Sequence, residues 1–225
     1  MNIGVIIAAG GIGQRMGGNR PKQFLEIAGQ PIIHHTLQVF QNMEEVKEVV
    51  IVLAKDYVES FQYQGPKHWQ VIPGGKQRQD SVSNGLKVIS DNCEVVLIHD
   101  AARPFISQDL IKQVAKQALN HGAAILACPI KETIKMVNSQ NTIIETIDRS
   151  KLWAAQTPQG FELKLFRKAM QAANEAGYVG TDDASLVERL GNKVHLVEGD
   201  SRNIKITTPE DLVIAEAIAK GWKEK

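Results

Sequence analysis

Short runs of β-branched, apolar residues recur along the chain and alternate with stretches of helical periodicity. The runs cover residues 3–7, 49–53, 94–98 and 123–127. Runs of this length and composition are typical of buried strands. Strands that alternate with helices favour a parallel sheet covered on both faces. The sequence therefore predicts an α/β fold.

The stretches between and after these runs carry signals of helices. Ser107 can cap a helix with an apolar stripe over residues 110–118. Residues 163–173 repeat the stripe, and a last helix is expected to begin at Thr208-Pro-Glu-Asp211 and to end near Gly221. Helices on both sides of the strands predict a Rossmann-like domain with a mostly parallel sheet.

One segment departs from this alternation. Residues 132–137 and 142–147 alternate in polarity around the polar turn 138–141, which indicates a β-hairpin. The hairpin is too short to be a domain. We therefore expect a single domain spanning residues 1–225, with a protruding β-arm at about residues 132–149.

The charge balance excludes several partners. Lysine and arginine number 26 against 25 aspartate and glutamate residues, so no global field favours nucleic acid or an anionic membrane. No apolar run approaches ~18 residues, and a strand at residue 3 leaves no room for a leader. We expect a cytoplasmic protein in which Cys93 and Cys128 are reduced core residues of strands.

A glycine-rich segment follows the first strand immediately. Its glycines, at positions 10, 11, 13, 17 and 18, allow the backbone to approach phosphate oxygens closely. Met16 stands where the dinucleotide fingerprint needs a third glycine. Gly18 and Lys76 are followed by Asn19 and Gln77, so the Walker pattern is absent as well.

Two cations distinguish this loop. Arg15 lies among the glycines and Lys22 follows Pro21, so fixed positive charges flank the expected path of a nucleotide triphosphate. Such a pair suits nucleotidyl transfer, in which catalysis is mostly positioning and charge stabilisation. The alternative is that both are solvated loop charges.

The residues of this loop carry a resemblance to a known family. The segment 8–17, with Pro21-Lys-Gln-Phe-Leu, is similar to the opening of the sugar-phosphate nucleotidyltransferases, and its Pro-Lys-Gln resembles the cytidylyltransferases of the methylerythritol phosphate pathway. Four later segments agree, in order along the chain: residues 74–81, 99–105, 156–161 and 203–212. The resemblance extends from about residue 3 to the last helix.

The resemblance implies a role for each matching position. Arg15 and Lys22 would stabilise the transition state, while Arg149 and Lys205 would position the acceptor phosphate. The nucleotide would contact Ala8, Ala9, Gly10, Gly11, Gly13, Gly75, Lys76, Ser81 and Asp100, and the acceptor would contact Arg103, Thr133, Thr157 and Thr181.

Several of these positions also have ordinary structural explanations. Residues 74–81 are compatible with a turn and a helix cap, Thr133 with a strand threonine, and Thr181 with a cap. Asp100 ends a strand, where ligands of open α/β sheets bind, but it can equally cap a loop. His99 is expected to be a packed neighbour of Asp100.

The resemblance also implies cofactors and partners. Mg²⁺ would be bound mainly through the phosphates of CTP, with Asp100 as a candidate ligand. The implied reaction is transfer of CMP from CTP to 2-C-methyl-D-erythritol 4-phosphate, in a homodimer whose arms reach the neighbouring site with Thr133 and Arg149. Ribitol 5-phosphate as acceptor, and a non-catalytic nucleotide-binding regulator, remain the alternatives.

Overall fold

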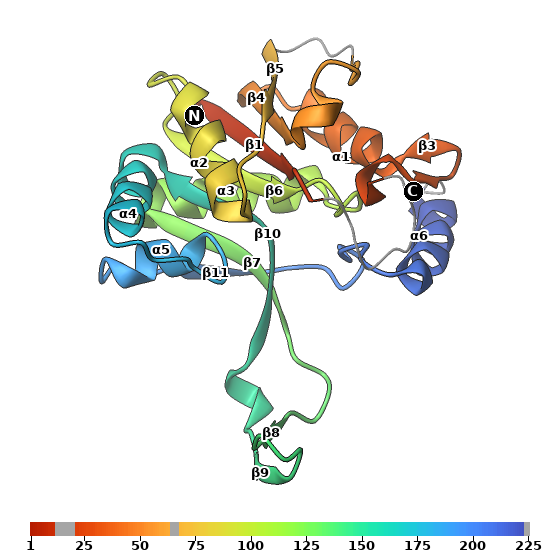
Figure 1. Cartoon of the computed structure of the whole chain (residues 1–225), viewed down its shortest axis with the longest axis vertical. Coiled ribbons are helices and arrows are strands. Elements are labelled where there is room, and N and C mark those ends of the chain that lie inside the picture. The colour runs from red at the N-terminus through yellow and green to blue at the C-terminus, as the bar shows by residue number, and fades with distance from the viewer. Residues whose placement is uncertain (12–20, 64–67, 223–225) are drawn as a thin grey trace.

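The structure, a computed structural model, describes residues 1–11, 21–63 and 68–222 (Figure 1). A seven-stranded sheet forms its centre, with the strand order β11-β7-β10-β6-β1-β4-β5. The strands are β1 (Ile3–Ala9), β4 (Val46–Leu53), β5 (His68–Pro73), β6 (Val95–Asp100), β7 (Ala123–Pro129), β10 (Trp153–Glu162) and β11 (His195–Glu198).

The sheet is mixed, with one strand reversed. β10 runs antiparallel to both of its neighbours, β6 and β7, whereas the pairs β1/β4, β1/β6, β4/β5 and β7/β11 are parallel. The prediction of a mostly parallel sheet is confirmed. β10 was not predicted from the sequence, because its polar residues Gln156, Thr157 and Gln159 interrupt the apolar pattern expected of a buried strand.

Helices cover both faces of this sheet, as predicted. Successive residues of β1 point to opposite faces, so Val5 and Ile7 pack with α1 and α3, while Ile6 packs with α2, α4 and α5. The helices are α1 (Ile32–Gln41), α2 (Arg78–Val88), α3 (Gln108–His121), α4 (Leu163–Glu175) and α5 (Ala184–Arg189). Ser107 caps α3, because its Oγ accepts a hydrogen bond from the Leu110 amide at 3.3 Å.

The last helix lies beside the sheet rather than on it (Figure 1). α6 (Pro209–Trp222) packs against the short pair β2 (Glu26–Ile27) and β3 (Gln30–Pro31). Ile27, Ile32 and Phe105 form a small separate core with its residues Ala215 and Ala219. The connections also contain the 3₁₀ helices η2 (Lys22–Phe24), η3 (Lys55–Tyr57) and η4 (Arg149–Lys151).

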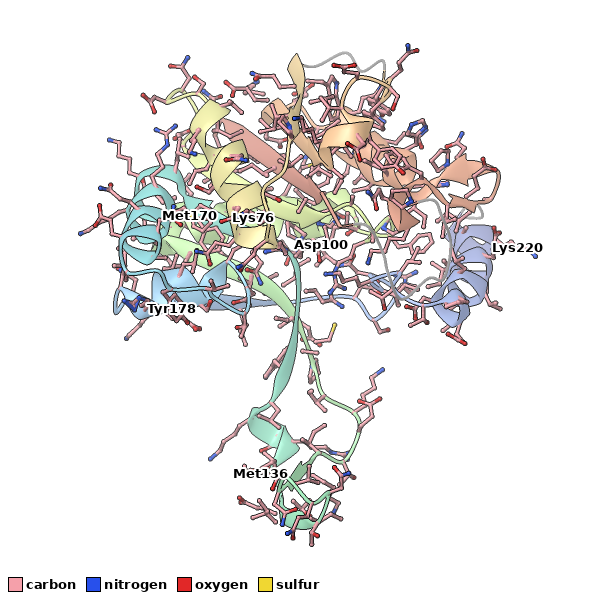
Figure 2. The ribbon with its side chains drawn as sticks, viewed as in Figure 1. Lys76, Asp100, Met136, Met170, Tyr178 and Lys220 are labelled. Atoms are coloured by element: carbon pink, nitrogen blue, oxygen red, sulfur yellow. The ribbon has the colours of Figure 1, made fainter. Side chains whose placement is uncertain are left out.

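The predicted arm is a hairpin that projects from the body (Figure 1). Its strands β8 (Lys135–Val137) and β9 (Ile143–Thr146) are shorter than the two alternating runs. The side chain of Asn138 organises the turn, since its Oδ1 accepts hydrogen bonds from the amides of Gln140 and Thr142. Apolar residues of the arm, including Met136, remain exposed (Figure 2).

Each of the two cysteines matches its expected position only in part. Cys93 is buried, but it lies in the turn before β6 and not in a strand. Cys128 lies in β7, as expected, yet it is only half-buried. Within the described ranges, no helix is long and apolar enough to cross a membrane.

Candidate functional site

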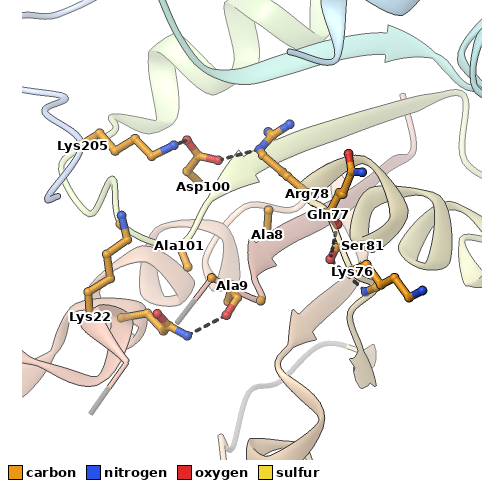
Figure 3. A pocket seen from close by; sticks show the side chains of 15 residues that line it. Ala8, Ala9, Lys22, Lys76, Gln77, Arg78, Ser81, Asp100, Ala101 and Lys205 are labelled. Carbon is orange, nitrogen blue, oxygen red and sulfur yellow. Dashed lines mark hydrogen bonds and ion pairs between the residues drawn. The ribbon is translucent and has the colours of Figure 1, made fainter. Parts of the chain in front are cut away.

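A cavity lies at the carboxyl ends of β1 and β6, facing the loop before α2 (Figure 3). This is the edge at which ligands bind to open α/β sheets. The register explains its position, because Ala8 of β1 pairs with Asp100 of β6 and both strands end together. The described residues that line it are Ala8, Ala9, Gly10, Gly11, Lys22, Gln23, Gly75, Lys76, Gln77, Arg78, Ser81, Asp100, Ala101, Ala102 and Lys205.

The cavity contains most of the residues expected to bind a nucleotide. The segment 8–11 and the residues Gly75, Lys76 and Ser81 line it, although they are far apart in the sequence. Gly13 and Arg15 lie outside the described residues. A Cβ at Gly75 would lie 2.2 Å from the Cβ of Asp80, so the turn before α2 accepts only glycine at this position.

Ser81 holds the loop before α2 in place. Its hydroxyl donates to the Gln77 carbonyl oxygen at 3.0 Å and accepts from the Gly75 amide at 3.1 Å. The helix cap itself is Gln77, which forms a capping box with Asp80. The cap and the cavity wall thus come from the same segment.

Asp100 is the most densely paired residue of the site. The residue is 6% exposed, and Lys205 Nζ lies 2.7 Å from Oδ2 while Arg78 Nε lies 3.3 Å from Oδ1. Arg103 Nε lies 3.8 Å from Oδ2. Burial alone would raise the pKa of Asp100, but Arg78 and Lys205 outweigh it and hold the pKa well below its usual range.

Arg78 is a site residue that the sequence analysis missed. Its guanidinium joins Asp100 to Asp183, with Nη1 2.7 Å from Asp183 Oδ2. Burial works against its charge, yet Asp183 and Asp100 raise the pKa of Arg78 above its ordinary value. Its position offered one signal: it is a cation in the first turn of a helix, where the helix dipole favours acids.

Lys22 and Gln23 belong to the 3₁₀ helix η2. Lys22 lines the cavity, and its Nζ donates to the Ile206 carbonyl oxygen at 3.1 Å. Gln23 is buried and its Nε2 donates to the Ala9 carbonyl oxygen at 2.6 Å. The side chain of Gln23 therefore fixes the segment that carries Lys22 against the end of β1.

Arg103 lies just after β6 and Lys205 lies in the segment before α6, and both approach Asp100. Arg103 Nη1 donates to the Asn203 carbonyl oxygen at 2.7 Å. Asn203 is fully buried, and its Nδ2 donates to the Thr157 carbonyl oxygen at 3.0 Å. Lys205 is partly exposed and lines the cavity, so its ammonium lies between Asp100 and the open space.

Thr157 supports Asp100 from behind the cavity. Its Oγ1 accepts from the Asp100 amide at 3.0 Å and lies 3.1 Å from His99 Nδ1. His99 Nε2 lies 3.0 Å from the Arg103 carbonyl oxygen, which can only accept, so Nε2 carries the proton and Nδ1 accepts from Thr157. Burial lowers the pKa of His99 to about 4, which keeps the ring neutral.

Thr181 lies on a neighbouring hollow rather than in the cavity. This hollow shares Gln77 and Arg78 with the cavity wall and is completed by residues before and within α5. The capping bond of α5 comes from Asp182, whose Oδ1 accepts from the Ser185 amide at 3.0 Å. Thr181 itself is exposed.

Thr133 and Arg149 do not line the described cavity of their own chain. Both are exposed residues of the arm, and Arg149 Nη1 donates to the Lys131 carbonyl oxygen. The arm that carries them points away from the sheet (Figure 1).

Known proteins share this architecture. A family described as 2-C-methyl-D-erythritol 4-phosphate cytidylyltransferase matches residues 3–221. A relative with this description from Geobacillus thermodenitrificans is 48% identical over 97% of both chains, and one from Caldanaerobacter subterraneus is 44% identical over 96% of this chain and 98% of the relative.

Solved structures agree with this similarity. The cytidylyltransferase structure from Thermus thermophilus is 35% identical, with a TM-score of 0.83 over 98% of this chain and all of the other. Sequence and fold match together over nearly the full length. The chain therefore belongs to the 2-C-methyl-D-erythritol 4-phosphate cytidylyltransferase family.

Proposed function

We propose that the chain transfers CMP from CTP to 2-C-methyl-D-erythritol 4-phosphate in the cavity described above. The products are 4-diphosphocytidyl-2-C-methyl-D-erythritol, a precursor of isoprenoids, and pyrophosphate. One observation supports this location most: Lys22, Arg78 and Lys205 meet a glycine-lined strand end in one cavity. Two phosphorylated substrates require cations and a backbone that can approach their phosphates closely.

The nucleotide occupies the side of the cavity that glycines line. The backbone of residues 8–11 and of Gly75 faces the base, ribose and phosphates, and Lys76 and Ser81 border the same space. Lys22 acts at the α-phosphate together with Arg15, where negative charge accumulates during transfer. The hydrogen bond from Gln23 to Ala9 keeps Lys22 at this position.

The acceptor phosphate occupies the side near Lys205 and Arg103. A phosphate oxygen attacks the α-phosphorus in line, the bond from that phosphorus to the bridging oxygen breaks, and pyrophosphate leaves with the electron pair. The attacking oxygen is already ionised at neutral pH, since the second pKa of a phosphate monoester is about 6. The site therefore needs cations that bring two anions together, and no general base.

A divalent cation fits this cavity. Mg²⁺ is usually held by one or two carboxylates and by substrate phosphates, and Asp100 is the one carboxylate among the described lining residues. Those residues hold no group of three or more acidic, histidine or cysteine side chains suited to a metal. Mg²⁺ bound mainly to the CTP phosphates, with Asp100 as protein ligand, would neutralise phosphate charge.

The second chain of a homodimer completes the site. Thr133 and Arg149 of one arm reach the acceptor in the partner's cavity, while the apolar side chains of the two arms pack together. Two observations support this arrangement. Thr133 and Arg149 are exposed on the arm, and Ile143 and Ile144 are 58% and 61% exposed within one chain.

Pyrophosphate release tests the proposed reaction. The purified chain with CTP and Mg²⁺ should release pyrophosphate with 2-C-methyl-D-erythritol 4-phosphate and much less with ribitol 5-phosphate. Mass spectrometry of the cytidine diphosphate product identifies the bond formed. A higher kcat/KM for ribitol 5-phosphate, or binding of CTP with no turnover of either acceptor, would refute the assignment.

A further inference from the structure

Arg78 joins two buried carboxylates that belong to different parts of the fold. Asp100 ends β6 in the cavity, and Asp183 precedes α5 and is 2% exposed. The Arg78 guanidinium uses separate nitrogens for the two: Nε for Asp100 Oδ1 and Nη1 for Asp183 Oδ2. Arginine can make such a bridge because its donors form a rigid fork.

The far end of the bridge is anchored to the sheet. Gln159 of β10 is buried, and its Nε2 donates to Asp182 Oδ2 at 2.8 Å while its Oε1 accepts from the Ala184 amide at 3.0 Å. Asp183 lies between these two anchored residues. Arg78 therefore connects Asp100 to a segment that hydrogen bonds anchor to the sheet.

The two oxygens of Asp100 serve different partners. Arg78 meets Oδ1, whereas Lys205 meets Oδ2 (Figure 3). Arg103 also lies near Oδ2. Because Arg78 holds Oδ1, the orientation of the Asp100 carboxylate is fixed. Oδ2 therefore holds the Lys205 ammonium at a defined position in the cavity. Without Arg78, the carboxylate can rotate, and this rotation would displace the side chains of Lys205 and Arg103.

We propose that Arg78 is a positioning residue for cytidylyl transfer: by bridging Asp183 to Oδ1 of Asp100, it fixes the carboxylate that places Lys205 for the acceptor phosphate. This inference rests on the function proposed above. The cost of placing a cation at the start of α2, against the helix dipole, is consistent with a role beyond helix stability.

The test separates positioning from stability with three variants. Arg78→Gln should lower kcat/KM for the acceptor by about 10- to 100-fold, with a much smaller change in the KM for CTP. It should also lower the Tm, since Asp183 stays buried without its cation. Asp183→Asn in the same chain removes that charge, so the double variant should regain Tm while its kcat/KM stays as low as that of Arg78→Gln.

The third variant, Arg78→Lys, keeps the charge but reaches one carboxylate at a time, so its kcat/KM should lie between wild type and Arg78→Gln. Arg167→Gln is the matched control, because the Arg167 side chain is equally exposed at 36% and pairs with Asp91 far from the cavity. It should keep wild-type kcat/KM.

Three results would overturn the proposal. One is recovery of kcat/KM together with Tm in the double variant, which would make the role of Arg78 purely structural. A second is a loss confined to the KM for CTP, and a third is unchanged turnover in Arg78→Gln. A wild-type chain that transfers no CMP would instead refute the proposed function, so the two failures are distinguishable.

Discussion

The cavity and the arm differ in where their side chains find partners. In the cavity, Asp100 pairs with Arg78 and Lys205 of the same chain. In the arm, Ile143 and Ile144 are exposed although they are among the most apolar residues of the chain. A two-stranded hairpin is marginally stable alone in water. The charged side chains of the cavity thus find their partners within one chain, whereas apolar side chains of the arm remain exposed.

The largest expected effect concerns the cations of the cavity. Lys22→Ala and Arg15→Ala should each lower kcat by ~10²-fold or more, comparable with the loss of one oxyanion donor. Steady-state pyrophosphate release measures kcat, and circular dichroism controls for folding. Near-normal turnover in both variants would show that these cations are solvated loop charges.

Mixing variants tests whether cavity and arm of different chains act together. Lys22→Ala disables the cavity, and Arg149→Ala disables the arm. If sites are shared, each mixed dimer contains one site with both changes and one with neither, so random exchange restores about a quarter of all sites. Activity of the mixture should therefore far exceed that of either parent.

The mixing experiment needs proof that subunits exchange, which two differently tagged chains provide by co-purification. If exchange occurs and activity stays at the sum of the parents, the site is confined to one chain and the arm serves another purpose.

A smaller effect is expected from the apolar surface of the arm. Replacing Ile143 and Ile144 by serine removes two exposed side chains, which should weaken association by at least ~10-fold and leave the fold intact. Analytical ultracentrifugation measures the dissociation constant. Val213→Ser on α6 is the control, because Val213 is 73% exposed and lies outside the arm. An unchanged dissociation constant in the arm variant would exclude this surface as the interface.

The smallest expected effect concerns the buried side chain of His99, next to Asp100, at low pH. His99 has a folded pKa of about 4, and a histidine in the unfolded chain titrates near ~6.5. Between these values the unfolded chain binds more protons, so stability falls as the pH falls, by up to about 1.4 kcal/mol per pH unit. That corresponds to a Tm lower by roughly 3–5 °C per unit.

His99→Gln should make the dependence of Tm on pH between 4.5 and 6.5 shallower, as scanning calorimetry can measure. His121→Gln, which changes an exposed histidine, should retain the wild-type slope. Equal slopes in His99→Gln and wild type would show that His99 is already charged in the folded protein.

Much of the fold could be predicted because periodicity and burial agree locally. β1 and β6 are continuous apolar runs, and residues 132–147 alternate around a polar turn, so these elements were identified correctly. β10 was missed because Gln156, Thr157 and Gln159 are buried through hydrogen bonds that no local pattern reveals. That residues 1–225 form a single domain stays a prediction.

The position of the cavity could be predicted where a strand end or a glycine determines it, as at Asp100 and Gly75, which both line it. The ion pair of Arg78 could not be predicted, because its partner Asp183 is 105 residues away in the sequence and adjacent only in the fold. Thr157 was predicted as an acceptor contact, and behind the described cavity its hydroxyl accepts a hydrogen bond from the Asp100 amide. The predicted roles of the site residues, those of Thr157, Thr133, Thr181 and Arg149 among them, stay predictions.

β10 makes the arm inseparable from the body. Its residues 153–155 are exposed beside the end of β7, while residues 156–161 are buried, and the strand lies between β7 and β6 in the middle of the sheet. Removing the whole strand would leave β11 and β7 without a hydrogen-bonded connection to the other four strands. A shortened protein can thus lose the tip of the hairpin. The part of β10 from Gln156 onward has to be kept, because it holds the two halves of the sheet together.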